Sequence, residues 1–154
     1  MTAGFAALLA VVLLSSAVPS AAAAAPAVGE ASAPASSKRV SLAEARVDTF
    51  FKQYRSAVLG RNAQQARQVR AQYLSADLNR RLDAWAAAHD ADPVFRAQNV
   101  PQSWFVRYGG SGAGSSTVVL TESWGGGNSR DVWYAVRLSD VLITDLADPS
   151  GPAD

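Results

Sequence analysis

The hydrophobic residues of this chain change their spacing once, close to Pro101. Before that point they recur every three or four residues, as on one face of a helix. After it they alternate with polar residues, as on a strand. A helical half followed by a half made of strands is typical of an α+β domain. The length of 154 residues allows one such domain with an extension.

Three helices are predicted in the first half, each from a start signal followed by an apolar stripe. Ser41 and Glu44 form a capping box for the first helix, and Gly60 is placed to end it. A second, shorter helix is predicted after Asn62, and a third after Ser75. The stripe of the first helix consists of Val47, Phe50, Phe51, Tyr54 and Val58.

Polar residues gather where the helical half ends. His89, Asp90, Asp92 and Pro93 follow the third helix closely, and Asp92 before Pro93 has the pattern of an N-cap that opens a helical turn. If the two halves pack on each other, this junction lies beside the groove between them. We therefore expect a site near it.

Four strands are predicted in the second half, over residues 104–108, 117–124, 131–138 and 141–146. The glycine-rich stretch 109–116 is expected to be a flexible hairpin loop, because it lacks the spacing of a phosphate-binding loop and precedes a strand. The expected fold class is α+β, with three N-terminal helices packed on a curved antiparallel sheet of about four strands.

The ends of the chain differ in composition from the domain. An apolar run at residues 5–14 followed by small residues predicts a cleaved signal peptide over residues 1–25. Small residues and prolines at 26–39 predict a disordered linker. The domain is expected at 40–148 and a disordered tail at 149–154. These assignments predict a secreted protein with no membrane span after cleavage.

Composition excludes several classes of function. The formal net charge of +1 argues against a nucleic-acid binder, which needs a basic excess to displace counterions from phosphates. The chain has no cysteine, so it has no disulfide, thiolate metal site or cysteine nucleophile. No spacing supports a metal site, and no cofactor or catalytic set is predicted.

Four segments resemble a family of small exported bacterial proteins of uncharacterised function. They are FFKQY from Phe50, YLSADL from Tyr73, DPVFRAQN from Asp92 and VLITDL from Val141, within residues 47–146. The resemblance implies the cystatin-like α+β roll, which nuclear transport factor two and polyketide cyclases share. It implies export as well, and no agreed catalytic residues. Many relatives look like lipoproteins, whereas this chain has no cysteine to lipidate.

Six residues are candidates for binding a ligand in the groove between helices and sheet. Most are aromatic, and their helical or strand spacing also fits a place in the core. His89, the single histidine, is expected to pack on Trp85 near the end of its helix. The candidates are Tyr54, Trp85, His89, Glu122, Trp124 and Tyr134.

Glu122 is the one charge on the strand face that should meet the helices. Buried and ionised, it would need a partner, such as His89 or an arginine of an adjacent strand, for example Arg107 or Arg137. Alternatively, the twist of the sheet leaves Glu122 in solvent near Trp124. The first interpretation places a proton-accepting or ligand-orienting group in the groove, and the second makes Glu122 structural.

Three classes of function remain open. The first is a secreted, non-enzymatic module that binds a small apolar ligand or another envelope or secreted protein. The second is a small acid–base enzyme of the polyketide-cyclase type, with His89 and a carboxylate in the groove. The third is an inhibitor or immunity protein that binds through an exposed loop such as residues 109–116.

Overall fold

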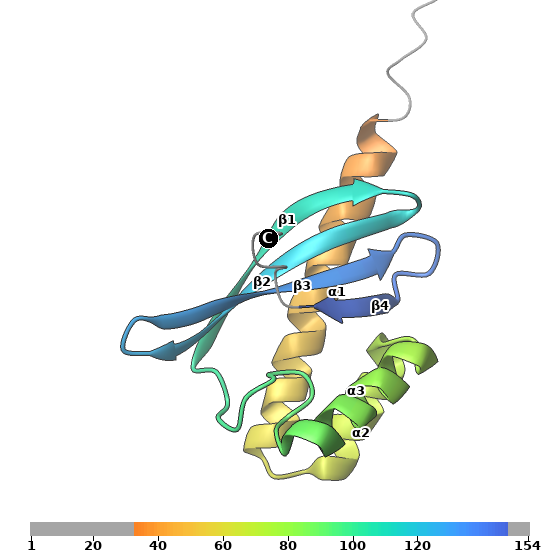
Figure 1. The fold of residues 1–154 in the computed structure, drawn as a ribbon. Coiled ribbons are helices and arrows are strands. Elements are labelled where there is room, and N and C mark those ends of the chain that lie inside the picture. Colours follow the sequence, from red (N-terminus) through yellow and green to blue (C-terminus); the bar gives the residue numbers. More distant parts are fainter. Residues whose placement is uncertain (1–32, 148–154) are drawn as a thin grey trace, which may run out of the picture. The chain divides into compact units, whose positions relative to one another are not determined.

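The computed structural model describes the backbone of residues 33–147 and the side chains of residues 42–147. Three helices precede four strands in the chain, and the strands form one antiparallel open sheet in the order β1-β2-β3-β4 (Figure 1). The α+β class predicted from the change of period is confirmed. The elements are α1 (Ala33–Leu59), α2 (Ala63–Tyr73), α3 (Ala76–His89), β1 (Ser103–Gly112), β2 (Ser115–Gly125), β3 (Asn128–Arg137) and β4 (Ile143–Ala147).

The first helix is longer than its capping box predicted. α1 begins at Ala33, inside the segment expected to be a linker, so Ser41 lies within the helix and does not start it. Gly60 does not end α1 in a left-handed conformation either. That conformation falls on Arg61, with φ of 52°, whose N–H donates to the Val58 carbonyl at 3.0 Å. The predicted signal peptide and tail lie outside the described residues.

The next two helices begin where their caps predicted. The Asn62 side chain accepts a hydrogen bond from the Gln65 N–H at 3.0 Å, and Ser75 Oγ accepts one from the Leu78 N–H at 3.2 Å. Asp90 ends α3 in the left-handed conformation. Local capping chemistry therefore sets where α2 starts and where α3 starts and ends.

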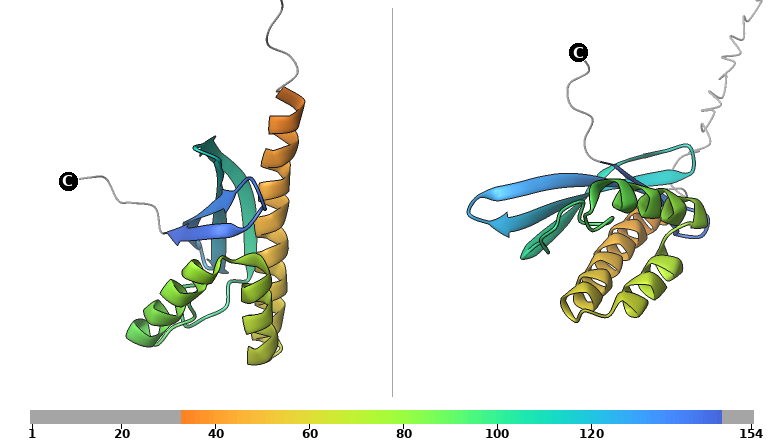
Figure 2. Two further views of the ribbon diagram at one scale, coloured as in Figure 1. Left: turned by 90° about the vertical axis from the view of Figure 1, so that its right-hand side faces the viewer. Right: turned by 60° about the horizontal axis from the view of Figure 1, so that its bottom comes forward.

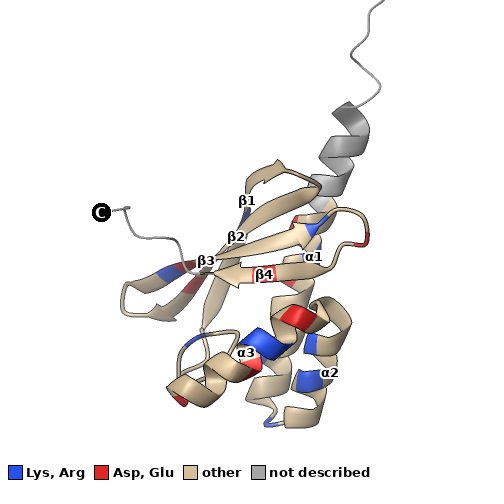
Figure 3. Ribbon diagram, turned by 45° about the vertical axis from the view of Figure 1, so that its right-hand side comes forward, with Lys and Arg blue, Asp and Glu red and all other residues tan. Residues whose placement is uncertain are grey.

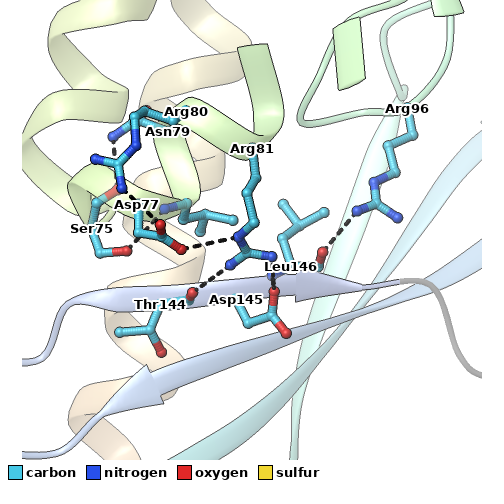
Figure 4. Close-up of polar contacts among 10 residues, drawn as sticks. Ser75, Asp77, Asn79, Arg80, Arg81, Arg96, Thr144, Asp145 and Leu146 are labelled. Atoms are coloured by element: carbon cyan, nitrogen blue, oxygen red, sulfur yellow. Dashed lines mark hydrogen bonds and ion pairs between the residues drawn. The ribbon is translucent and has the colours of Figure 1, made fainter. Parts of the chain in front are cut away.

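The helices do not all cover the same part of the sheet. α1 packs along one face against β1 and β2, whereas α2 packs mainly on α1 and α3 meets β4 (Figure 2). Arg81 of α3 donates to Asp145 Oδ1 at 2.8 Å and to the Thr144 carbonyl at 3.0 Å (Figure 4). The core lies between α1 and the sheet, and its largest fully buried side chains include Phe50, Phe51, Phe95, Leu120 and Tyr134.

The hairpin that joins β1 to β2 is tighter than expected. β1 continues to Gly112 and β2 begins at Ser115, so only Ala113 and Gly114 turn the chain, with φ of 47° and 77°. The prediction of a flexible loop over residues 109–116 is wrong. Two consecutive positive φ angles match the twist of paired strands, and a register shift after Tyr108 accommodates the extra residue.

Candidate functional site

A pocket of about 450 Å³ opens among the three helices and the segment that follows α3. We call it the helical pocket. Its apolar wall comes from small side chains of all three helices, and its polar groups are arginine, aspartate, asparagine and tyrosine. The lining residues are Tyr54, Val58, Arg61, Asn62, Ala63, Ala66, Arg67, Arg70, Asp83, Ala86, Asp92 and Pro93.

One polar contact of the pocket joins α1 to the segment after α3. The Tyr54 hydroxyl donates to Asp92 Oδ2 at 2.9 Å, and Asp92 Oδ1 accepts from the N–H groups of Val94 and Phe95, both at 2.9 Å. Asp92 thus caps the turn that follows it, as its place before Pro93 predicted. One carboxylate oxygen therefore holds this segment against α1, and the other caps the segment's own turn.

The Tyr54 hydroxyl stays protonated far into the alkaline range. Burial raises the pKa of Tyr54 well above its ordinary value of 10.0, and the negative charge of Asp92 raises it further. The ionised phenol would be poorly solvated and would face a carboxylate. At neutral pH, Tyr54 is therefore a fixed hydrogen-bond donor with its proton directed at Asp92.

A second polar contact joins α2 to α3. Arg70 is buried, and its Nη2 donates to Asp83 Oδ1 at 2.8 Å and to the Asn79 carbonyl at 3.0 Å. Its Nε donates to Asn79 Oδ1 at 3.1 Å. Arg70 and Asp83 also line a second pocket of about 430 Å³ between the two helices. This pair therefore forms a wall shared by two surface pockets.

The predicted junction is placed partly as expected. Asp92 and Pro93 line the helical pocket, but His89 and Asp90 do not. His89 stacks on Trp85 with ring centroids 4.2 Å apart and planes 10° apart, which confirms the predicted packing. Its Nδ1 lies 2.7 Å from the Trp85 carbonyl oxygen. Of the six candidates, Tyr54 alone lines the helical pocket.

Glu122 is buried and pairs with an arginine of an adjacent strand, though not with either of the two named from the sequence. Its side chain is 0% exposed, and Arg130, directly opposite on β3, donates to its Oε2 at 3.0 Å. Arg130 also donates to the carbonyl of Phe95. The pair therefore holds the segment after α3 against the sheet. The register of β2 and β3 places Arg130, rather than Arg107 or Arg137, opposite Glu122.

Trp124 and Tyr134 have separate surroundings. Trp124 Nε1 donates to the Asn99 carbonyl at 3.1 Å beside a shallow pocket of about 370 Å³. Tyr134 is completely buried, and its hydroxyl has no hydrogen-bond partner among the described residues. Burial raises the pKa of Tyr134 well above 10.0, and the charge of Glu122 adds to this.

The helical pocket contains residues that the site prediction missed. Arg70 could have been found, because it lies four residues after Ala66 and three before Tyr73 on the apolar stripe of its helix. A charge at such a position needs a buried partner. Asp83 and Ala86 gave no comparable signal, since they reach the pocket only through the way α3 packs.

Neither a metal centre nor a membrane-spanning helix is found among the described residues. Within them, no group of three or more histidine, cysteine, aspartate or glutamate side chains could hold a metal ion. No helix in residues 33–147 has the length and apolar character needed to cross a membrane.

Comparison with known proteins informs the fold. No protein-family model matches the chain, and no curated protein matches it. The chain is similar in structure to a protein of unknown function from Bacteroides thetaiotaomicron VPI-5482, with a TM-score of 0.61 and 21% sequence identity. The likeness covers 76% of this chain and 97% of the other. At that identity it bears on the fold alone.

Proposed function

We propose that the protein is an exported, non-enzymatic binding protein that holds a small ligand in the helical pocket. The observation that carries the proposal is a preformed pocket of about 450 Å³ whose inner polar groups already bind one another. A cavity of this size with an apolar wall and few polar groups is typical of small-molecule sites. The ligand's apolar part would pack against Val58, Ala66 and Ala86.

The chemistry of the pocket favours binding over catalysis. Asp92 accepts three hydrogen bonds from the protein, and Tyr54 keeps its proton at neutral pH, so both groups are engaged in holding the wall of the pocket together. The acid–base alternative required His89 in the groove, and His89 does not line the helical pocket.

The proposal includes the cystatin-like roll and export. Support for the roll comes from three helices followed by an antiparallel meander, and support for export from the apolar run at residues 5–14. We expect the mature protein to begin between about Ala22 and Val28, because small residues gather there. Intact mass of the protein recovered from the culture medium tests this. Unprocessed chain fixed in the membrane would contradict export.

A titration followed by two-dimensional amide NMR tests binding in the helical pocket. The probe is 2-naphthalenemethanol, a neutral molecule with a rigid apolar body. We expect its addition to shift the amide signals of Ala63, Ala66 and Ala86 in the folded protein. Absence of shifts at these residues, for this probe and for its carboxylate analogue, would contradict the proposal.

A matched pair of variants on α3 provides the control. Ala86→Phe places a ring in the pocket and should abolish the shifts, whereas Ala87→Phe adds the same ring at an exposed neighbour. Binding that survives Ala86→Phe unchanged would place the probe elsewhere.

A further inference from the structure

The charges that line the helical pocket do not balance. Three arginines and two aspartates line it. Asp92 is engaged by Tyr54 and two backbone N–H groups, and Asp83 is engaged by Arg70. The carboxylates are therefore committed to holding the walls together. Arg61 and Arg67 are the two lining cations that remain.

Arg61 and Arg67 are available to a ligand. Both are exposed, and neither side chain forms a hydrogen bond or ion pair with any residue in the described part of the chain. Arg61 belongs to the connection between α1 and α2, and Arg67 to the second turn of α2. Figure 3 shows basic residues along α2 and at the α1–α2 connection. Two exposed arginines thus line one pocket whose wall is partly apolar.

The backbone at Arg61 is unfavourable for arginine. Its φ of 52° lies in the left-handed region, where glycine or asparagine is preferred. Gly60 precedes it and Asn62 follows it, so a residue suited to that conformation stands on either side. An arginine at the strained position is a cost in folding that a ligand contact would explain.

We propose that the ligand of the helical pocket is an amphipathic carboxylate. Its apolar body packs on the alanine and valine wall, and its carboxylate accepts hydrogen bonds from Arg61 and Arg67. Guanidinium groups suit this task because their planar N–H pairs match the two oxygens of a carboxylate. The inference rests on the proposed function and adds the chemical class of the ligand.

Matched probes separate the charge of the ligand from its shape. The same NMR titration uses 2-naphthoate, neutral 2-naphthalenemethanol and cationic 2-naphthylmethylamine. We expect naphthoate to bind about tenfold more tightly than the alcohol, as one charge-assisted pair provides, and the amine to bind most weakly. The preference for naphthoate should shrink as salt rises, because exposed charges are screened within about 8 Å at physiological ionic strength.

Single substitutions then identify the recognising residues. Arg61→Gln and Arg67→Gln should each weaken naphthoate binding several-fold and leave the alcohol unchanged. Lys52→Gln removes one positive charge from an exposed position of α1 that does not line the pocket, and should change neither. An equal loss of naphthoate binding in Lys52→Gln would mean general charge attraction and overturn the inference.

Arg61→Gly gives a second test, in which loss of naphthoate binding cannot be attributed to a less stable fold. Glycine relieves the left-handed strain, so this variant should melt no earlier than the wild type and still lose the preference for naphthoate. A variant that melts earlier and keeps the preference would assign Arg61 a purely structural role.

The outcomes for the two proposals can be told apart. If naphthoate and the alcohol bind the pocket equally and the arginine variants bind both as the wild type does, the ligand class is wrong and the binding function stands. If no probe shifts the pocket residues, the binding function fails, and the inference about the carboxylate fails with it.

Discussion

Two regions of the domain each combine a buried tyrosine with an arginine–carboxylate pair. In the helical pocket, Tyr54 contacts Asp92 while Arg70 pairs with Asp83, whose side chain is 69% exposed. At the sheet, Tyr134 lies in the field of Glu122, which is 0% exposed and pairs with Arg130. The same residue types therefore meet in an open setting and in a closed one.

The difference shows why buried charge alone does not identify a site. The carboxylate of Glu122 and the guanidinium of Arg130 serve to anchor the segment after α3, and Glu122 does not line the helical pocket. In the helical pocket the internal pairs leave an open space, and two exposed arginines are among the residues that line it. Phe95 connects the regions, because its ring lies 5.4 Å from that of Tyr54 and its carbonyl accepts from Arg130.

The largest effect is expected from removing the ring that supports this connection. Phe51 is completely buried and lies 5.4 Å from Phe95 and 5.3 Å from Trp104, between ring centroids. Phe51→Ala should lower the free energy of unfolding by about 4 kcal/mol through lost contacts and a cavity. Denaturant melts measure this. A loss below about 1 kcal/mol would contradict the shared core.

The two ion pairs should respond unequally to removal of their carboxylates. Glu122→Ala removes the buried carboxylate that Arg130 contacts and should cost about 3 kcal/mol. Asp83→Ala removes a largely exposed charge and should cost about 1 kcal/mol or less. Glu122→Gln, which keeps the shape, should lie between them. Equal losses for the two alanine variants would remove the contrast between closed and open pairs.

Alkaline pH should destabilise the domain through both tyrosines. Each has a folded-state pKa above its ordinary value of 10.0, so its stabilising contribution is complete below pH 10 and falls as pH rises further. Each should subtract about 1.4 kcal/mol in total between pH 9 and 11, because the tyrosine of the unfolded chain begins to ionise near pH 10. Denaturant melts between pH 9 and 11 measure the slope. The double variant Tyr54→Phe with Tyr134→Phe should flatten it, and an unchanged slope would contradict this assignment.

Single removal of the two hydroxyls should have opposite consequences. Tyr54→Phe breaks the bond to Asp92 and should cost about 1 kcal/mol. Tyr134→Phe removes a buried hydroxyl with no hydrogen-bond partner among the described residues, so stability should stay the same or rise. Thermal melts at neutral pH compare them. A greater loss at Tyr134 would reveal a contact that the structure does not show.

The smallest effect is expected at the mouth of the pocket. Arg67 is exposed and unpaired within residues 42–147, so Arg67→Ala should change the free energy of unfolding by less than about 0.5 kcal/mol. The same denaturant melts measure it. A loss above about 1 kcal/mol would mean that Arg67 stabilises the wall of the pocket and is not available to bind a ligand.

Element types could be predicted from the sequence more reliably than element ends. The caps at Asn62 and Ser75 act within three residues, and both were found. The start of α1 was missed, because the local signal at Ser41 lies inside a longer helix. The glycine-rich turn was predicted too loose, since pairing with β2 extends β1 to Gly112.

The candidate site was predictable only in part. Tyr54 and Asp92 were marked by a helical stripe and by a cap before proline, and both line the pocket. Helical spacing made Trp85 and His89 candidates as well, yet they stack on each other and do not line the helical pocket. Spacing tells which residues share a face of one helix. It does not tell what that face meets.

By itself the sequence determined the order of helices and strands, the face of the sheet that is buried and the caps of two helices. These follow from interactions between residues a few positions apart and from the period of the apolar residues. Tertiary structure alone decided that Glu122 pairs with Arg130 and that Arg61 and Arg67 share a pocket with Asp83. Such pairings depend on register and on how helices cross, which contacts between distant segments fix.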